Sequence, residues 1–94
     1  MYKLPPVDLL EATHEFPGPY MFKAIGHLSN SFVARTVAAM RSALGVEVDP
    51  PYTIRQTNNG RFGAITFQVR ATSAQQVLEV YRVMQKLEGL IYLW

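Results

Sequence analysis

The 94-residue sequence has no cysteine, two histidines and few charged residues, 17% of the total. Without cysteine, neither a disulfide framework nor a thiolate metal site can form. The sequence also lacks a basic-then-apolar segment of the signal-peptide type and any apolar run near the roughly 18 residues that cross a membrane. We therefore expect a cytoplasmic protein without a membrane segment.

Catalytic and metal-binding patterns are missing as well. The histidines, His14 and His27, are far apart in the sequence and have no neighbour at the spacing of metal ligands. No nucleophile-elbow motif occurs, and the carboxylates Glu47 and Asp49 share one loop, which more often means a solvated surface than an acid–base pair. We expect no catalytic residue, no metal and no cofactor, and hence a protein that is not an enzyme.

Apolar residues are plentiful by contrast, at 49%, and the net charge is +2. A chain of this length and composition is typical of one domain. Residues 1–15 hold one lysine against three acidic residues, whereas residues 16–87 hold eight lysines and arginines against three. We interpret residues 1–15 as a flexible acidic leader and residues 16–94 as a single, mildly basic domain.

The stretch from Tyr52 to Ala71 predicts a β-hairpin with a two-residue turn at Asn59-Gly60, because both positions favour positive φ. Pairing outward from that turn sets Ile65 opposite Ile54 and puts five apolar residues on one face: Tyr52, Ile54, Ile65, Phe67 and Val69. The other face carries Arg55, Thr57, Phe62, Ala64, Thr66, Gln68 and Arg70. The first face is expected to be covered by the rest of the chain.

The flanking sequence predicts a strand and a helix on each side of the hairpin. A strand over 20–27 turns Tyr20, Phe22 and Ala24 inward, because Lys23 on the other side is costly to bury. Ser29 or Asn30 is expected to cap the next helix, which ends at Gly45, and Thr72 or Ser73 begins a second helix, which ends at Gly89. A short strand over 90–94 completes the chain.

The resulting order, β-α-β-β-α-β, predicts an α+β fold. With right-handed crossovers, the economical arrangement is a ferredoxin-like two-layer sandwich. Its four-stranded antiparallel sheet has the order 4-1-3-2, and both helices lie on one face. The other face stays open to solvent.

Several blocks of residues resemble the YbeD-like family of small bacterial proteins. They are Phe16-Pro17, Tyr20, Phe22-Lys23 and Ile25-Gly26; then Arg55, Thr57, Gly60, Phe62, Ala64 and Thr66; then Gln76-Val77, Tyr81 and Leu87. The resemblance implies a ferredoxin-like domain similar to ACT-type regulatory domains. It also implies a link to lipoate metabolism, through a gene-neighbourhood association with lipoyl transfer.

Two candidate sites follow from the predicted fold. The turn with Gly26, His27, Ser29 and Asn30 delivers a helix N-terminus, which suits a carboxylate effector. On the open face, Arg55, Phe62 and Arg70 indicate an interaction surface.

For that surface we expect a protein partner or self-association as a homodimer, which Trp94 would anchor if exposed. The alternative partner is single-stranded RNA. The stretch Arg61 to Phe67 copies much of an RNA-recognition strand, although Ala64 stands where a second stacking aromatic belongs.

Overall fold

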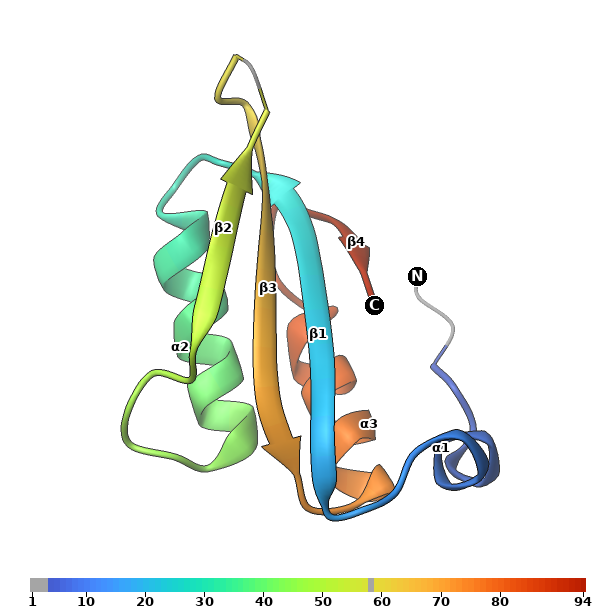
Figure 1. Cartoon of the computed structure of the whole chain (residues 1–94). Coiled ribbons are helices and arrows are strands. Elements are labelled where there is room, and N and C mark those ends of the chain that lie inside the picture. The colour runs from blue at the N-terminus through green and yellow to red at the C-terminus, as the bar shows by residue number, and fades with distance from the viewer. Residues whose placement is uncertain (1–3, 58) are drawn as a thin grey trace.

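A four-stranded antiparallel sheet with helices on one face forms the protein in the computed structural model, which describes residues 4–57 and 59–94 (Figure 1). Along the chain the elements are α1 (Val7–Thr13), β1 (Gly18–His27), α2 (Phe32–Leu44), β2 (Tyr52–Gln56), β3 (Phe62–Ala71), α3 (Ala74–Met84) and β4 (Leu90–Leu93). The strand order β2-β3-β1-β4 is the predicted order read from the other edge, so the predicted α+β architecture is confirmed.

The hairpin has the predicted register. Tyr52 lies opposite Phe67 and Ile54 opposite Ile65. The turn itself differs, because the Gly60 N–H donates to the Thr57 carbonyl, so the hydrogen-bonded reversal spans 57–60 and begins earlier than a two-residue turn at Asn59-Gly60 would. The Asn59 side chain accepts from the Thr57 hydroxyl and from the Arg61 N–H, which stabilises this wider loop. The predicted pairing of Asn58 with Arg61 lies outside the described residues.

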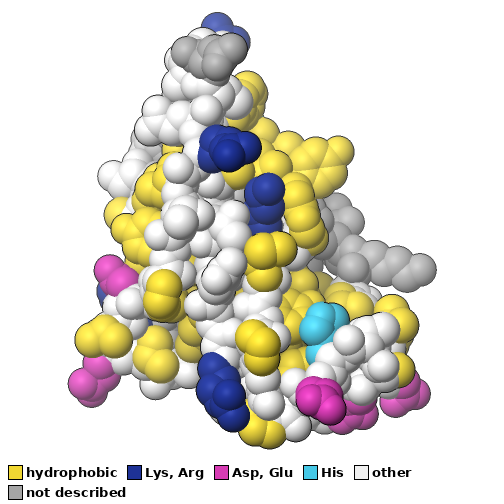
Figure 2. Space-filling model, viewed as in Figure 1, with side chains coloured by type: hydrophobic (Ala, Val, Ile, Leu, Met, Phe, Trp, Pro, Cys, Tyr) yellow, Lys and Arg dark blue, Asp and Glu magenta, His cyan; other side chains and the backbone are white. Residues whose placement is uncertain are grey.

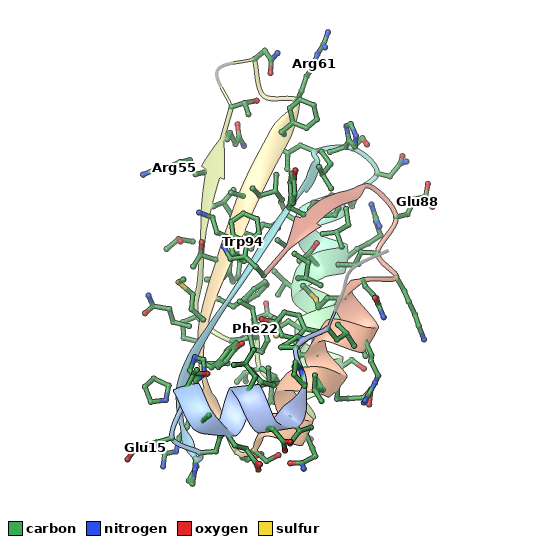
Figure 3. All side chains as sticks on the ribbon, turned by 90° about the vertical axis from the view of Figure 1, so that its right-hand side faces the viewer. Glu15, Phe22, Arg55, Arg61, Glu88 and Trp94 are labelled. Atoms are coloured by element: carbon green, nitrogen blue, oxygen red, sulfur yellow. The ribbon has the colours of Figure 1, made fainter. Side chains whose placement is uncertain are left out.

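The inward face of the two central strands forms the core with α2 and α3. Phe22 and Ala24 on β1 and Ile65 and Phe67 on β3 are fully buried. Figure 3 shows the sheet edge-on, with Phe22 pointing between the sheet and the helices. The predicted inward and outward faces of both strands are therefore confirmed.

The inward side of β2 is less covered than the sequence indicates. Tyr52 and Ile54 face the helix side as predicted, but each keeps about two fifths of its surface exposed, at 40% and 41%. The reason is position: β2 is an edge strand, paired on one side by β3. Tyr52 still contacts the core through Phe67, with ring centroids 5.8 Å apart.

The segment before β1 contains a helix, α1, which lies beside the lower half of β1 and packs against α3 (Figure 1). Its Leu10 is 3% exposed and belongs to the core. β4 pairs with the other half of β1, from residue 23 to residue 26, so α1 covers what that short strand leaves. The division into a leader and a domain stays a prediction.

Helix ends were predicted less well than faces. The N-cap of α2 is Ser31, not Ser29 or Asn30, because Asn30 and Ser31 both adopt left-handed backbone and delay the helix. The predicted cap of α3 is confirmed at Ser73, whose hydroxyl accepts from the Gln76 N–H at 3.1 Å. That helix ends at Met84 rather than at Gly89, since tighter turns then lead the chain into β4, which pairs with β1.

Candidate binding surface on the open sheet face

The outward side chains of the sheet form a surface that we call the open face. Figure 2 looks onto it and shows lysines and arginines among hydrophobic side chains, with acidic side chains at the left edge and at the lower right. The outward strand positions are Pro19, Met21, Lys23, Ile25, His27, Thr53, Arg55, Phe62, Ala64, Thr66, Gln68, Arg70 and Tyr92. They include three cations and no carboxylate, so the open face is electropositive.

The strand registers arrange the centre of this face in two rows. One row runs from Arg55 on β2 through Ala64 and Ile25 to Tyr92 on β4. The next row runs from Thr53 through Thr66 to Lys23, whose backbone exchanges two hydrogen bonds with Trp94. Each row therefore begins with a polar side chain on one sheet edge and ends with an aromatic ring on the other.

The aromatic end of these rows is exposed. Tyr92 keeps 61% of its surface exposed and Trp94 keeps 47%, and their rings meet edge to face with centroids 6.0 Å apart. The Lys23 ammonium lies 5.5 Å from the centre of the Trp94 ring, within the range of a cation–π contact. A large aromatic pair left in solvent beside a cation is typical of an interaction site.

The three residues predicted for this surface do not lie together. Phe62 and Arg55 occupy the same end of the face, about two residues apart along the sheet. Phe62 is half-buried against His27, with ring centroids 4.9 Å apart. Arg70 lies six residues from Ala64 along β3, about 20 Å from the row of Arg55. Arg55 points away from the sheet into solvent (Figure 3).

The predicted turn site is built differently from a simple helix end. Gly26 faces inward, and a Cβ placed there would lie 2.3 Å from the Phe32 ring and 2.7 Å from the Gly89 carbonyl oxygen. The Arg35 side chain donates to the carbonyls of Asn30 and Ser29 on one loop and of Glu88 on the other. Arg35 therefore ties the turn to the segment before β4. His27, by contrast, points to the open face.

The sequence places Lys23 on the outward side of its strand but gives it no role, and it does not identify Tyr92 as a member of the surface. Strand β4 is apolar throughout and shows no alternation, so its outward positions depend on its pairing with β1. A register shift between Ile25 and Gly26 changes that pairing midway. Trp94 was the one signal available, as a large aromatic residue at an exposed edge.

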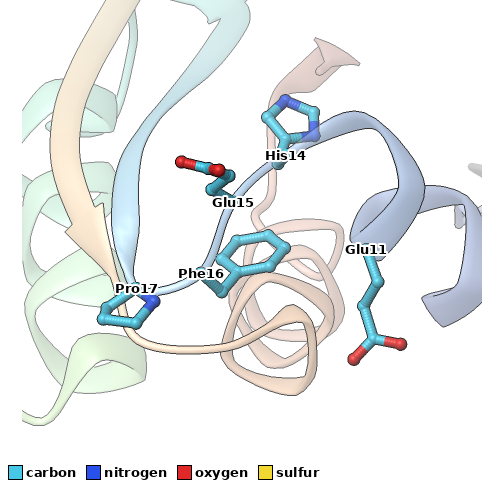
Figure 4. Close-up of a pocket in the computed structure, with 5 residues that line it drawn as sticks. All are labelled: Glu11, His14, Glu15, Phe16 and Pro17. Carbon is cyan, nitrogen blue, oxygen red and sulfur yellow. The ribbon is translucent and has the colours of Figure 1, made fainter.

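A second group of polar side chains lines a hollow beside α1, formed by Glu11, His14, Glu15, Phe16 and Pro17. The glutamates and the histidine point in different directions (Figure 4). His14 instead contacts the Thr13 hydroxyl and the Tyr20 ring. Across residues 4–57 and 59–94, no group of three or more acidic, histidine or cysteine residues is placed to hold a metal, and no helix is long and apolar enough to span a membrane.

Comparison with known proteins defines the class of this chain. Residues 11–93 match the family described as "Protein of unknown function (DUF493)". The chain belongs to this uncharacterised bacterial family, as the resemblance to YbeD-like proteins predicts.

Its curated relatives are named only as UPF0250 proteins. One from Chromobacterium violaceum is 30% identical over 79% of this chain and 83% of its own length. One from Shewanella piezotolerans is 28% identical over 81% of this chain and 84% of its own length. One from Shewanella halifaxensis is 26% identical over the same shares. These names carry no activity.

Proposed function

We propose that this chain is a non-catalytic, cytoplasmic regulatory module that binds another protein through the open face. The observation that carries the proposal is the composition of that face: exposed aromatic residues beside unpaired cations, with no carboxylate among the outward strand positions. Exposed aromatic residues and arginine are enriched where proteins bind one another. The partner is therefore expected to present acidic and apolar groups.

The chemistry of the face supports binding rather than catalysis. Its polar groups are cations, hydroxyls and one amide, and its only histidine contacts Phe62. An acid–base or nucleophilic mechanism needs a base held against a reacting group. Shape and charge complementarity need no such constellation, and an uncovered sheet supplies both.

The test is site-specific photo-crosslinking in a bacterial lysate. A photoreactive phenylalanine derivative replaces Tyr92 on the open face, and in the matched control it replaces Arg82, which is exposed on α3. We expect a discrete product of higher mass from position 92 that is absent from position 82 and that is reduced in an Arg55→Glu background. Equal products from both positions, or none from position 92, would contradict the proposal.

Self-association is distinguished in the same experiment. Two copies with different affinity tags are mixed, and a homodimer gives a product that carries both tags. A product with both tags that depends on Arg55 would identify the partner as a second copy of this chain.

The resemblance to YbeD-like proteins supports a narrower proposal, that the partner acts in lipoate metabolism. Its test uses a lipoyl-bearing carrier domain as the probe and the unmodified carrier as the control. The ¹⁵N-labelled chain is titrated with each, and amide shifts on the open face with both carriers, or with the lipoylated one alone, would support the link. The absence of amide shifts with either carrier would contradict the link to lipoate metabolism.

Single-stranded RNA is the second candidate partner, and Tyr92 and Trp94 favour it. Base stacking on exposed aromatic rings contributes about 1–3 kcal/mol per base. These two rings stand on the same sheet face as Phe62 and compensate for the aromatic residue that Ala64 replaces. RNA binding would weaken steeply with salt and would be reduced by Trp94→Ala.

Effector binding at the turn with Gly26, His27, Ser29 and Asn30 is a third proposal. It is supported by the N-cap of α2, where Ser31 makes no side-chain capping bond. Titration of the labelled chain with acetate and with lipoate would move amides of residues 29–34 if this turn binds carboxylates. The absence of such shifts at millimolar concentrations would contradict it.

A further inference from the structure

A shallow hollow lies across the middle of the open face, between β1, β3 and β2. It is lined by Lys23, Thr53, Ile54, Arg55, Ala64 and Thr66. Ala64 lies between Arg55 on one neighbouring strand and Ile25 on the other, and its small side chain leaves the hollow open. Ala64, which stands where an RNA-recognition strand has a stacking aromatic residue, thus leaves a concave site instead.

The hollow is rich in hydrogen-bond donors and contains no acidic side chain. Its lining residues include one lysine, one arginine and two threonines. Among the described residues, none of these four side chains takes part in a hydrogen bond or an ion pair. Cations that lack a carboxylate partner and surround a hollow favour a bound anion.

The number and placement of the donors favour a phosphate group. The residues that carry these donors lie on three strands, so their side chains can reach a bound group from several sides. A phosphate offers oxygens in several directions, whereas a carboxylate offers two in one plane. The Arg55 fork can engage two phosphate oxygens, and the Lys23 ammonium adds a compact charge from the other side.

The exposed ring of Trp94 lies next to this hollow. Lys23 lines the hollow and also lies 5.5 Å from the centre of the Trp94 ring. Trp94 is two strands away from Thr66, about 10 Å at the usual strand spacing. A ligand with a phosphate at one end and a planar ring at the other can bridge these two positions.

We propose that the hollow is the phosphate subsite of a nucleotide-binding site, in which the base contacts Trp94. This inference rests on the proposed function, because it assigns an effector to the same open face. A nucleotide bound there covers Lys23 and Arg55, the cations that would meet an acidic partner. Nucleotide binding is therefore expected to compete with the protein partner.

The experiment is a titration of the ¹⁵N-labelled full chain, with adenosine 5′-monophosphate, adenosine and a ten-residue oligoadenylate as separate probes. We expect the monophosphate to shift the amides of Lys23, Ala64 and Thr66, and adenosine to bind roughly tenfold or more weakly because it lacks the charged group. Equal binding of both, or shifts that avoid both the hollow and Trp94, would overturn the inference.

The variants sharpen this result. The double variant Lys23→Gln/Arg55→Gln should weaken monophosphate binding roughly tenfold or more, while Arg82→Gln, a matched cation on α3, should leave it unchanged. Trp94→Leu should weaken the monophosphate and leave inorganic phosphate unaffected. Unchanged binding in the double variant would overturn the inference.

The probes also separate the two sources of a nucleotide phosphate. Binding of the monophosphate at least as tightly as the oligoadenylate identifies a free nucleotide. Tighter binding of the oligoadenylate, with shifts that extend to Phe62 and a steep salt dependence, identifies a single strand. If neither probe binds while the crosslink at position 92 persists, the nucleotide inference fails and the proposed function stands.

Discussion

The two faces of the same sheet differ in what they contain. Along β1 and β3 the covered face holds no charged side chain, and Phe22, Ala24, Ile65 and Phe67 on it are fully buried. The open face of the same strands carries Lys23 and Arg70 among apolar neighbours. One set of alternating positions therefore explains why the chain folds, and the other set is free to determine what it binds.

This difference shows where function should be sought. Residues of the covered face are constrained by packing, because interiors are close-packed and one added or lost methylene group is felt. Outward residues contribute little to stability and can vary with the partner. Tyr92 and Trp94 are exposed and do not belong to the core cluster, so packing does not explain them. Binding to a partner explains them better.

The largest expected effect comes from truncating a core ring on the covered face. Phe67→Ala should lower the free energy of unfolding by about 3–5 kcal/mol, because Phe67 is fully buried and a cavity would remain. The matched control is Phe62→Ala, the same change on the same strand but on the open face, which should cost about 1 kcal/mol. Urea denaturation measures both. Equal losses of unfolding free energy in the two variants would show that the open face contributes as much to stability as the covered face.

A smaller effect is expected from adding a single methyl group. Gly26→Ala places a Cβ against the Phe32 ring and the Gly89 carbonyl, and this overpacking should cost about 1–3 kcal/mol. Ala64→Ser adds one atom on the open face and should change stability by no more than about 0.5 kcal/mol. Thermal unfolding of the two variants distinguishes them, and a neutral Gly26→Ala would show that this end of the core is loosely packed.

The covered and open faces could be predicted from the sequence because their signals are local. The Asn59-Gly60 dipeptide limits the hairpin register, and the period of two then assigns each side chain to a face. The cap of α3 could also be predicted, because its residues are close in the sequence. The Ser73 hydroxyl accepts from the Gln76 N–H, and the Gln76 side-chain oxygen accepts from the Thr72 N–H.

The remaining features depend on contacts between distant segments. The left-handed pair before α2 lies next to Phe32, and the segment after α3 brings Gly89 close to Gly26, a residue far away in the sequence. For the site, Arg55 and Phe62 were placed on the open face correctly. Lys23 was also placed outward correctly, but Tyr92 could not be assigned, because the β1–β4 register includes a shift that no local pattern shows.

A pH-dependent effect is expected from the covered side. Burial, and then the hydrogen bond between the Tyr20 and Tyr81 hydroxyls at 3.0 Å, raise the pKa of Tyr81 well above its usual value. Since an unfolded tyrosine ionises near pH 10, the unfolded state loses this proton first, and stability should fall as pH rises above about 10. At pH 10.5 the loss should be about 1 kcal/mol relative to pH 8.

Tyr81→Phe is the control for this effect, because it removes the ionising group and keeps the ring. Urea denaturation at both pH values should show a smaller decrease for Tyr81→Phe than for the natural chain. The same decrease in both proteins would assign the pH dependence to other groups, the lysines above all.

The smallest expected effect lies at the centre of the open face. Lys23→Gln and Arg55→Gln should each change the free energy of unfolding by no more than about 0.5 kcal/mol, because neither side chain forms an ion pair or hydrogen bond among the described residues. A small gain in stability is the more informative result, since removing one of these positive charges relieves repulsion between them. A gain in stability together with a loss of ligand or partner binding would assign these cations to function. A loss of stability as large as that of Gly26→Ala would instead show that they support the fold.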